Sequence, residues 1–82
     1  MYALVCTNED GEVFPIIISK DKEKLRKKLQ EESNAEIEDA LHSGYTNDEL
    51  DAITQQETDW ARVGIEDSWY YDWTITEVAE EI

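Results

Sequence analysis

The segment WYYDWTITEV, residues 69–78, carries the clearest strand pattern in the chain. One face of the predicted strand is aromatic and aliphatic: Trp69, Tyr71, Trp73 and Ile75. The other face is more polar: Tyr70, Asp72, Thr74 and Thr76. A period of two with β-branched threonines is typical of a half-buried strand. We therefore expect Trp73 and Ile75 in the core with Tyr71 beside them, and Tyr70 and Asp72 on the exposed surface.

The N-terminal residues predict a β-hairpin. YALVCT (2–7) and EVFPIII (12–18) are apolar and rich in strand-forming residues, and Asp10-Gly11 lies between them as a turn signal. Pro15 has no N–H to donate, so the second strand should be an edge strand or bulged there.

Two helices are predicted from residue 19 to residue 44. Ser19 can cap a helix that starts at Lys20, in which Leu25 and Leu29 form a thin apolar stripe. The pair Ser33-Asn34 indicates a break, after which Asn34 caps a short helix that ends at Gly44.

The segment YTNDEL, residues 45–50, contains a helix-start signal. Thr46 and Glu49 have the spacing of a capping box, T-x-x-E. The helix is predicted from Asn47 to about Trp60, with Leu50, Ile53 and Trp60 facing the core.

These segments predict an α+β fold in one domain, residues 1–82. The expected architecture is ββααβ, a small two-layer sandwich in which an antiparallel sheet of about three strands carries two or three helices on one face. Residues 63–65 could add a short strand. A chain of 82 residues has little room for an enclosed pocket, so a shallow or flat binding surface is expected.

Charge is distributed very unevenly along the chain. Asp and Glu number 21 against 7 Lys and Arg, for a net charge of −14. Residues 1–28 have a net charge of +1, whereas residues 29–82 carry sixteen acids and one base, Arg62. This field repels nucleic acids and anionic membranes and favours a basic protein partner. Solubility alone is the alternative explanation.

Residues suited to catalysis or metal binding are scarce. The chain has one histidine, His42, and one cysteine, Cys6, which excludes the common His/Cys zinc sites. Cys6 lies in an apolar strand and is interpreted as a core residue, and no nucleotide- or calcium-binding motif is present. We expect no catalysis, cofactor or metal. With one cysteine, no signal peptide and no long apolar run, we expect a cytoplasmic protein.

The acid-rich segments TNDELDAITQQETDW (46–60) and IEDSWYYDW (65–73) give the chain a resemblance to a known class. In size, acidity and lack of catalytic motifs it resembles the small acidic inhibitors encoded by phages and mobile elements, including DNA-mimic anti-restriction and anti-CRISPR proteins. The resemblance implies a stoichiometric blocker of a nucleic-acid-handling enzyme. The lysine-rich segment 20–28 departs from a uniformly acidic mimic.

A predicted partner-binding set follows from the charge. About 30 Å of duplex DNA carries about 18 charges, close to the sixteen acids of residues 29–82. The predicted contacting residues are Asp48, Asp51, Glu57, Asp59, Glu66, Asp67, Asp72 and, as an aromatic anchor, Tyr70. Two other functions remain open: an immunity protein or antitoxin against a basic nuclease toxin, and a regulatory or structural module whose acidity serves only solubility.

Overall fold

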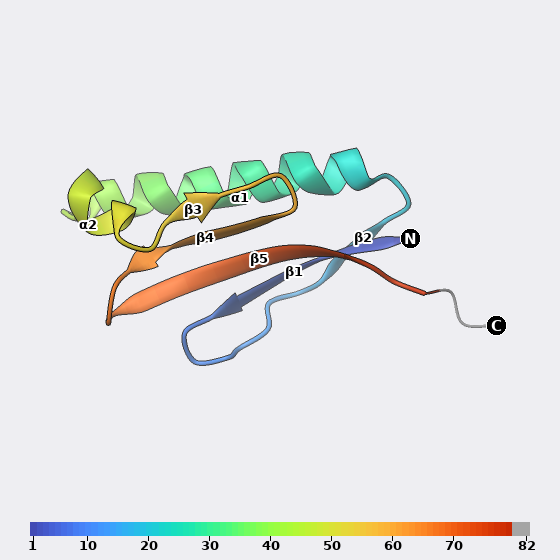
Figure 1. The fold of residues 1–82 in the computed structure, drawn as a ribbon, viewed down its shortest axis with the longest axis horizontal. Coiled ribbons are helices and arrows are strands. Elements are labelled where there is room, and N and C mark those ends of the chain that lie inside the picture. The colour runs from blue at the N-terminus through green and yellow to red at the C-terminus, as the bar shows by residue number, and fades with distance from the viewer. Residues whose placement is uncertain (80–82) are drawn as a thin grey trace.

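The computed structural model describes residues 1–79 and shows one long helix lying along a five-stranded antiparallel sheet (Figure 1). The elements in chain order are β1 (Tyr2–Asn8), β2 (Ile17–Ser19), α1 (Lys22–His42), α2 (Asn47–Asp51), β3 (Gln55–Gln56), β4 (Trp60–Ile65) and β5 (Trp69–Glu77). The strand order is β2-β1-β5-β4-β3. The predicted α+β class is confirmed, but the sheet has five strands instead of about three.

Strand β5 occupies the centre of the sheet. Its alternation of apolar and polar residues is typical of a strand with one buried face. It pairs with β1 on one side and β4 on the other, so that Trp73 lies opposite both Cys6 and Ala61. Trp73 and Ile75 are buried and Tyr71 is half-buried, which confirms the face predicted to point inward.

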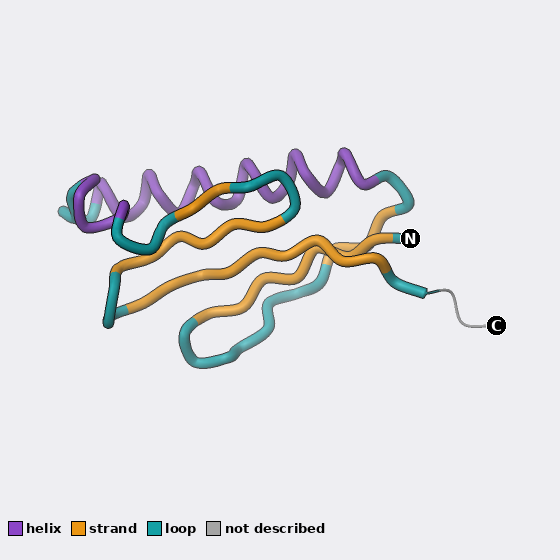
Figure 2. Tube along the Cα trace, viewed as in Figure 1, coloured by secondary structure: helices purple, strands orange, loops and turns teal. Residues whose placement is uncertain are grey.

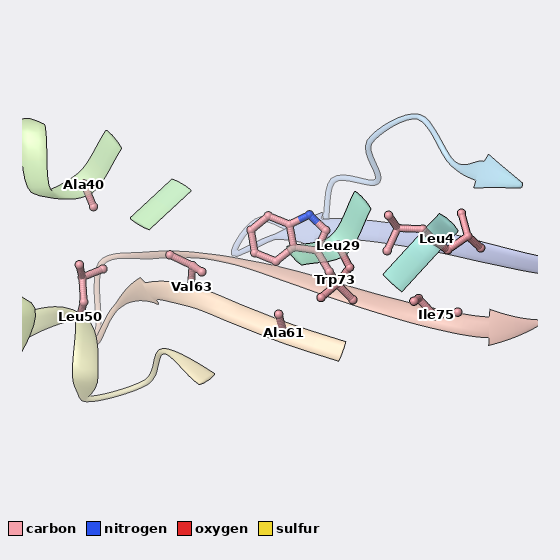
Figure 3. Packing of buried hydrophobic residues seen from close by; sticks show 9 residues of the cluster. Leu4, Leu29, Ala40, Leu50, Ala61, Val63, Trp73 and Ile75 are labelled. Atoms are coloured by element: carbon pink, nitrogen blue, oxygen red, sulfur yellow. The ribbon is translucent and has the colours of Figure 1, made fainter. Parts of the chain in front are cut away.

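The core lies between this face of the sheet and α1. Helix α1 contributes Leu25, Leu29 and Ala40, and Figure 3 shows Trp73 among the side chains of the cluster. The remaining members are Leu4, Leu50, Ala61, Val63 and Ile75. Because all of these side chains are 8 % exposed or less, this layer supplies most of the hydrophobic stabilisation.

The predicted break at Ser33-Asn34 is wrong, because α1 is one unbroken helix of 21 residues that includes both positions. Ser33 is fully buried, and its hydroxyl donates to the carbonyl oxygen of Leu29 one turn earlier at 2.8 Å. Back-bonding satisfies the side chain without leaving the helix. No helix within residues 1–79 has the length and apolarity to cross a membrane.

The helix starts later than predicted. Asp21 is the N-cap, because its carboxylate accepts from the backbone N–H of Glu23 at 3.0 Å. Ser19, the predicted cap, instead accepts from the N–H of Asp21. The predicted end is confirmed: the helix closes at Ser43, and Gly44 has a φ of 102°, which favours glycine.

The third predicted helix is much shorter than expected. The capping box of Thr46 and Glu49 is present, but α2 ends at Asp51 instead of near Trp60. Ile53 and Thr54 are β-branched and disfavour helix, and the next residues form β3, which pairs with β4. Trp60 starts β4 and is 42 % exposed, so its predicted core position is wrong. The short strand suggested at residues 63–65 is confirmed as part of β4.

The N-terminal hairpin forms with a shorter second strand than predicted. Gly11 adopts a φ of 76° in the turn, but only residues 17–19 form β2, after an isolated bridge between Thr7 and Val13. Figure 2 shows the resulting long loop between β1 and β2. Pro15 lies in this loop, where no strand hydrogen bond requires a backbone N–H from it.

Candidate protein-binding surface

The charges of helix α1 are divided between its two halves. The first half carries Lys24, Lys27 and Lys28, all exposed, and the second half carries Glu38 and Asp39, also exposed. Twenty-one helical residues extend about 30 Å, and α1 lies along the long dimension of the molecule, which measures 48 Å (Figure 1). All lysines and the arginine of α1 lie in its first half, which also carries Glu23, Glu31 and Glu32, whereas the second half carries acids but no lysine or arginine.

The acidic half of α1 ends beside other acidic segments. Helix α2 and the turn between β4 and β5 lie at the same end of the molecule as the end of α1 (Figure 1). The exposed carboxylates that these segments carry are Glu38, Asp39, Asp48, Glu49, Asp51, Glu66 and Asp67. We call this set the acidic end. Its segments contain no lysine or arginine, and only the exposed His42 could add a positive charge.

Four of the eight residues predicted to bind a partner belong to the acidic end: Asp48, Asp51, Glu66 and Asp67. Glu57 is exposed between β3 and β4, where it accepts a hydrogen bond from the Gln55 side chain at 2.7 Å. Glu57 and Asp59 lie beside the first half of α1, and Tyr70 and Asp72 lie on the strand face that points away from α1. The structure therefore divides the predicted set into three groups.

The charge of Asp59 is already paired within the molecule. Its carboxylate lies 2.7 Å from Arg26 Nε and 3.1 Å from Lys22 Nζ, and Arg26 also pairs with Glu23. The hydrogen bonds from Arg26 and then from Lys22 lower the pKa of Asp59. These contacts join the β3–β4 turn to the first turns of α1. They therefore indicate a structural role for Asp59.

Asp72 is also paired, on the face of the sheet away from α1. Two nitrogens of Arg62 bind its two carboxylate oxygens, Nε at 2.6 Å and Nη2 at 3.1 Å. The hydrogen bonds to Asp72 raise the pKa of Arg62, and the guanidinium lies 4.9 Å from the centre of the Tyr70 ring. The one base of residues 29–82 thus neutralises Asp72 and covers Tyr70.

A cleft that was not predicted from the sequence lies between α1 and the β1–β2 loop. Its volume is about 490 Å³, and its apolar lining comes from Leu4, Cys6, Phe14, Pro15, Ile17, Ala35, Tyr71 and Trp73. Two carboxylates also line it, Glu32 and Glu36, which are one helical turn apart. The predicted break at residue 33 separated these two acids, whereas an unbroken helix would have placed them on one face.

The thiol of Cys6 in this cleft is unsuited to nucleophilic chemistry. Burial, and then the charges of Glu32, Glu36 and Asp72, raise its pKa to about 11. The thiolate is therefore scarce at neutral pH. Within residues 1–79, no three His, Cys, Asp or Glu side chains are grouped so that they could hold a metal ion.

No protein-family model, no curated protein and no solved structure matches this chain.

Proposed function

We propose that this protein is a non-enzymatic inhibitor that binds a basic nucleic-acid-handling protein through the acidic end. One observation carries the proposal: the acidic end holds seven exposed carboxylates, and its segments contain no lysine or arginine. The lysines of α1 lie in the opposite half of that helix, and Arg62 is engaged with Asp72. A basic protein can therefore approach the acidic end without meeting like charge.

The proposed mode of inhibition is occupation of a groove that otherwise holds the phosphate backbone of a nucleic acid. Carboxylates can occupy the positive potential of such a groove, and long-range attraction accelerates association at low salt. Because Asp59 and Asp72 are paired internally, they contribute little to this attraction. The proposed contacts are Asp48, Asp51, Glu66 and Asp67, together with their neighbours Glu38, Asp39 and Glu49.

The test is capture of a partner by the immobilised protein from a lysate of a host that carries DNA-defence systems. The variant reverses three charges of the acidic end, Glu38→Lys, Asp51→Lys and Glu66→Lys. The matched control reverses three exposed lysines, Lys20→Glu, Lys24→Glu and Lys27→Glu. We expect a basic protein that elutes with added salt and is displaced by competing duplex DNA.

The acidic-end variant should lose this partner, with binding weakened by about 1–3 kcal/mol for each well-buried pair and by less for each rim pair. The control should bind as well as the wild type or slightly better. If the lysine reversals abolish binding and the acid reversals leave it intact, the basic half of α1 is the working surface. If both variants and the wild type behave alike, the acidity serves solubility.

A further inference from the structure

The cleft between α1 and the β1–β2 loop contains a buried acidic oxygen with no partner. Oε2 of Glu32 is inaccessible to solvent and accepts no hydrogen bond within the described chain. The ion pairs of residues 1–79 involve neither Glu32 nor Glu36. Leaving a buried acceptor unpaired costs free energy, which a ligand donor would recover if the Glu32 side chain rotated to turn this oxygen into the cleft.

The walls of the cleft suit an extended apolar stem. The rings of Phe14 and Tyr71 lie 5.8 Å apart and those of Tyr71 and Trp73 lie 6.0 Å apart, measured between centroids. Such rings bind methylene groups through their faces and attract cations through their quadrupoles. The two carboxylates disfavour an anion, and a purely apolar occupant would bury them further without pairing them.

Burial, together with unbalanced negative charge, raises the pKa of two groups that line the cleft. Burial, and then the charges of Asp39 and Glu32, raise the pKa of Glu36. Burial followed by the charge of Glu36 raises the pKa of Tyr71 on the facing strand. A positive charge in the cleft would oppose both effects.

We propose that the cleft receives a lysine or arginine side chain of a protein partner, with its cationic group on Glu32 and Glu36 and its methylene stem against Tyr71 and Trp73. The assignment of this side chain to a protein partner rests on the proposed function, because a basic partner presents many lysine and arginine residues. The cleft would then add a specific pocket to the long-range attraction of the acidic end.

The test uses the whole chain and a defined probe instead of the unknown partner. Amide NMR signals are followed while acetyl-Gly-Lys-Gly-amide, or its arginine counterpart, is added to about 20 mM, a range that detects millimolar dissociation constants. A norleucine peptide has an apolar side chain of similar length and no ammonium group. The variants are Glu32→Gln and Glu36→Gln, and the matched control is Glu31→Gln, at an exposed residue of the same helix outside the acidic end.

We expect the lysine or arginine peptide to shift the signals of Cys6, Tyr71 and Trp73, and the norleucine peptide to leave them unchanged. Each cleft variant should bind about tenfold more weakly, as expected for loss of a charge-assisted hydrogen bond. The control should change by less than about twofold. Equal binding of norleucine, equal weakening by Glu31→Gln, or no shift with either cationic peptide would overturn the proposal.

The peptide titration tests the cleft and the capture experiment tests the proposed function, so a negative result in one does not decide the other. A positive titration with no partner captured through the acidic end would refute the proposed function and leave the chemistry of the cleft standing. A captured partner together with a negative titration would refute the cleft alone.

Discussion

Replacing Glu36 with glutamine should make the folded protein more stable at neutral pH. Glu36 is half-buried, and it has Glu32 four residues before it and Asp39 three residues after it on the same helix. Burial and these two like charges all act against its charged form. Glutamine has nearly the same shape and helix propensity but carries no charge.

The magnitude follows from the two helical neighbours. Like charges at these spacings each destabilise a helix by about 0.2–0.5 kcal/mol. Together with the partial burial, Glu36→Gln should raise the free energy of unfolding by about 1 kcal/mol, which corresponds to a rise in Tm of about 4–8 °C in a domain of this size.

The effect should depend on pH in one direction. Because the pKa of Glu36 is raised above its ordinary 4.5 in the folded state, folding favours its protonated form. Its contribution to stability is complete below pH 4.5 and is lost as the pH rises through the raised pKa. The variant does not suffer this loss, so its advantage over the wild type should be full at pH 7 and should disappear below pH 4.5.

The assay is urea unfolding followed by tryptophan fluorescence at pH 7 and at about pH 4, with Glu38→Gln as the control. Glu38 is exposed on the same helix, so its substitution should change stability by less than about 0.5 kcal/mol. A Glu36→Gln variant less stable than the wild type at pH 7, or equally favoured at both pH values, would refute this reasoning.

Two further substitutions test the fold. Thr46→Ala removes the side-chain acceptor for the N–H of Glu49 and should lower the free energy of unfolding by about 1 kcal/mol; an unchanged urea midpoint would show that the capping box contributes nothing. Gly64→Ala would place a Cβ 2.4 Å from the carbonyl oxygen of Trp69 and 2.5 Å from Cβ of Tyr70, so it should cost about 1–3 kcal/mol through overpacking. A thermal melt that matches the wild type would mean that the β4–β5 pair can separate at no cost.

The sequence predicted correctly those elements that are determined by interactions between residues close together in the chain. The alternation of residues 69–77 identified β5 and its buried face, and the spacing of Thr46 and Glu49 identified a helix start. In both cases the deciding interactions lie within a few residues of one another. The α+β class followed from the mixture of these two periods.

The errors occurred where distant residues decide the structure. Ser33 has a weak intrinsic helix propensity. In the structure it is buried beneath Gln56, whose side-chain amide donates a hydrogen bond to the Ser33 hydroxyl at 2.8 Å, and this tertiary contact stabilises serine in the middle of α1. Trp60 has the spacing of a helical core residue, but pairing of β4 with β5 opposite Thr74 turns it outward. Tertiary context overrides propensity in both cases.

The candidate site divides in the same way. Composition alone predicted an acidic surface, and four of the eight contacts predicted from the sequence lie together at the acidic end. Composition could not predict which carboxylates are paired, because the partners of Asp59 lie 33 and 37 residues away in the chain. The cleft depends on the juxtaposition of α1, β1 and β5, which no short motif encodes.

The pairing of β1 with β5 has a consequence for the order of events in folding. Tyr2 lies opposite Glu77 and Asn8 lies opposite Tyr71, so the middle of the sheet joins segments more than sixty residues apart. Closing so large a loop is entropically costly and is repaid only when both strands are in place. Until β5 has been synthesised, β1 and β4 each lack their central neighbour. We therefore expect a single late folding step, with the amides of β1 and β4 acquiring protection from hydrogen exchange together.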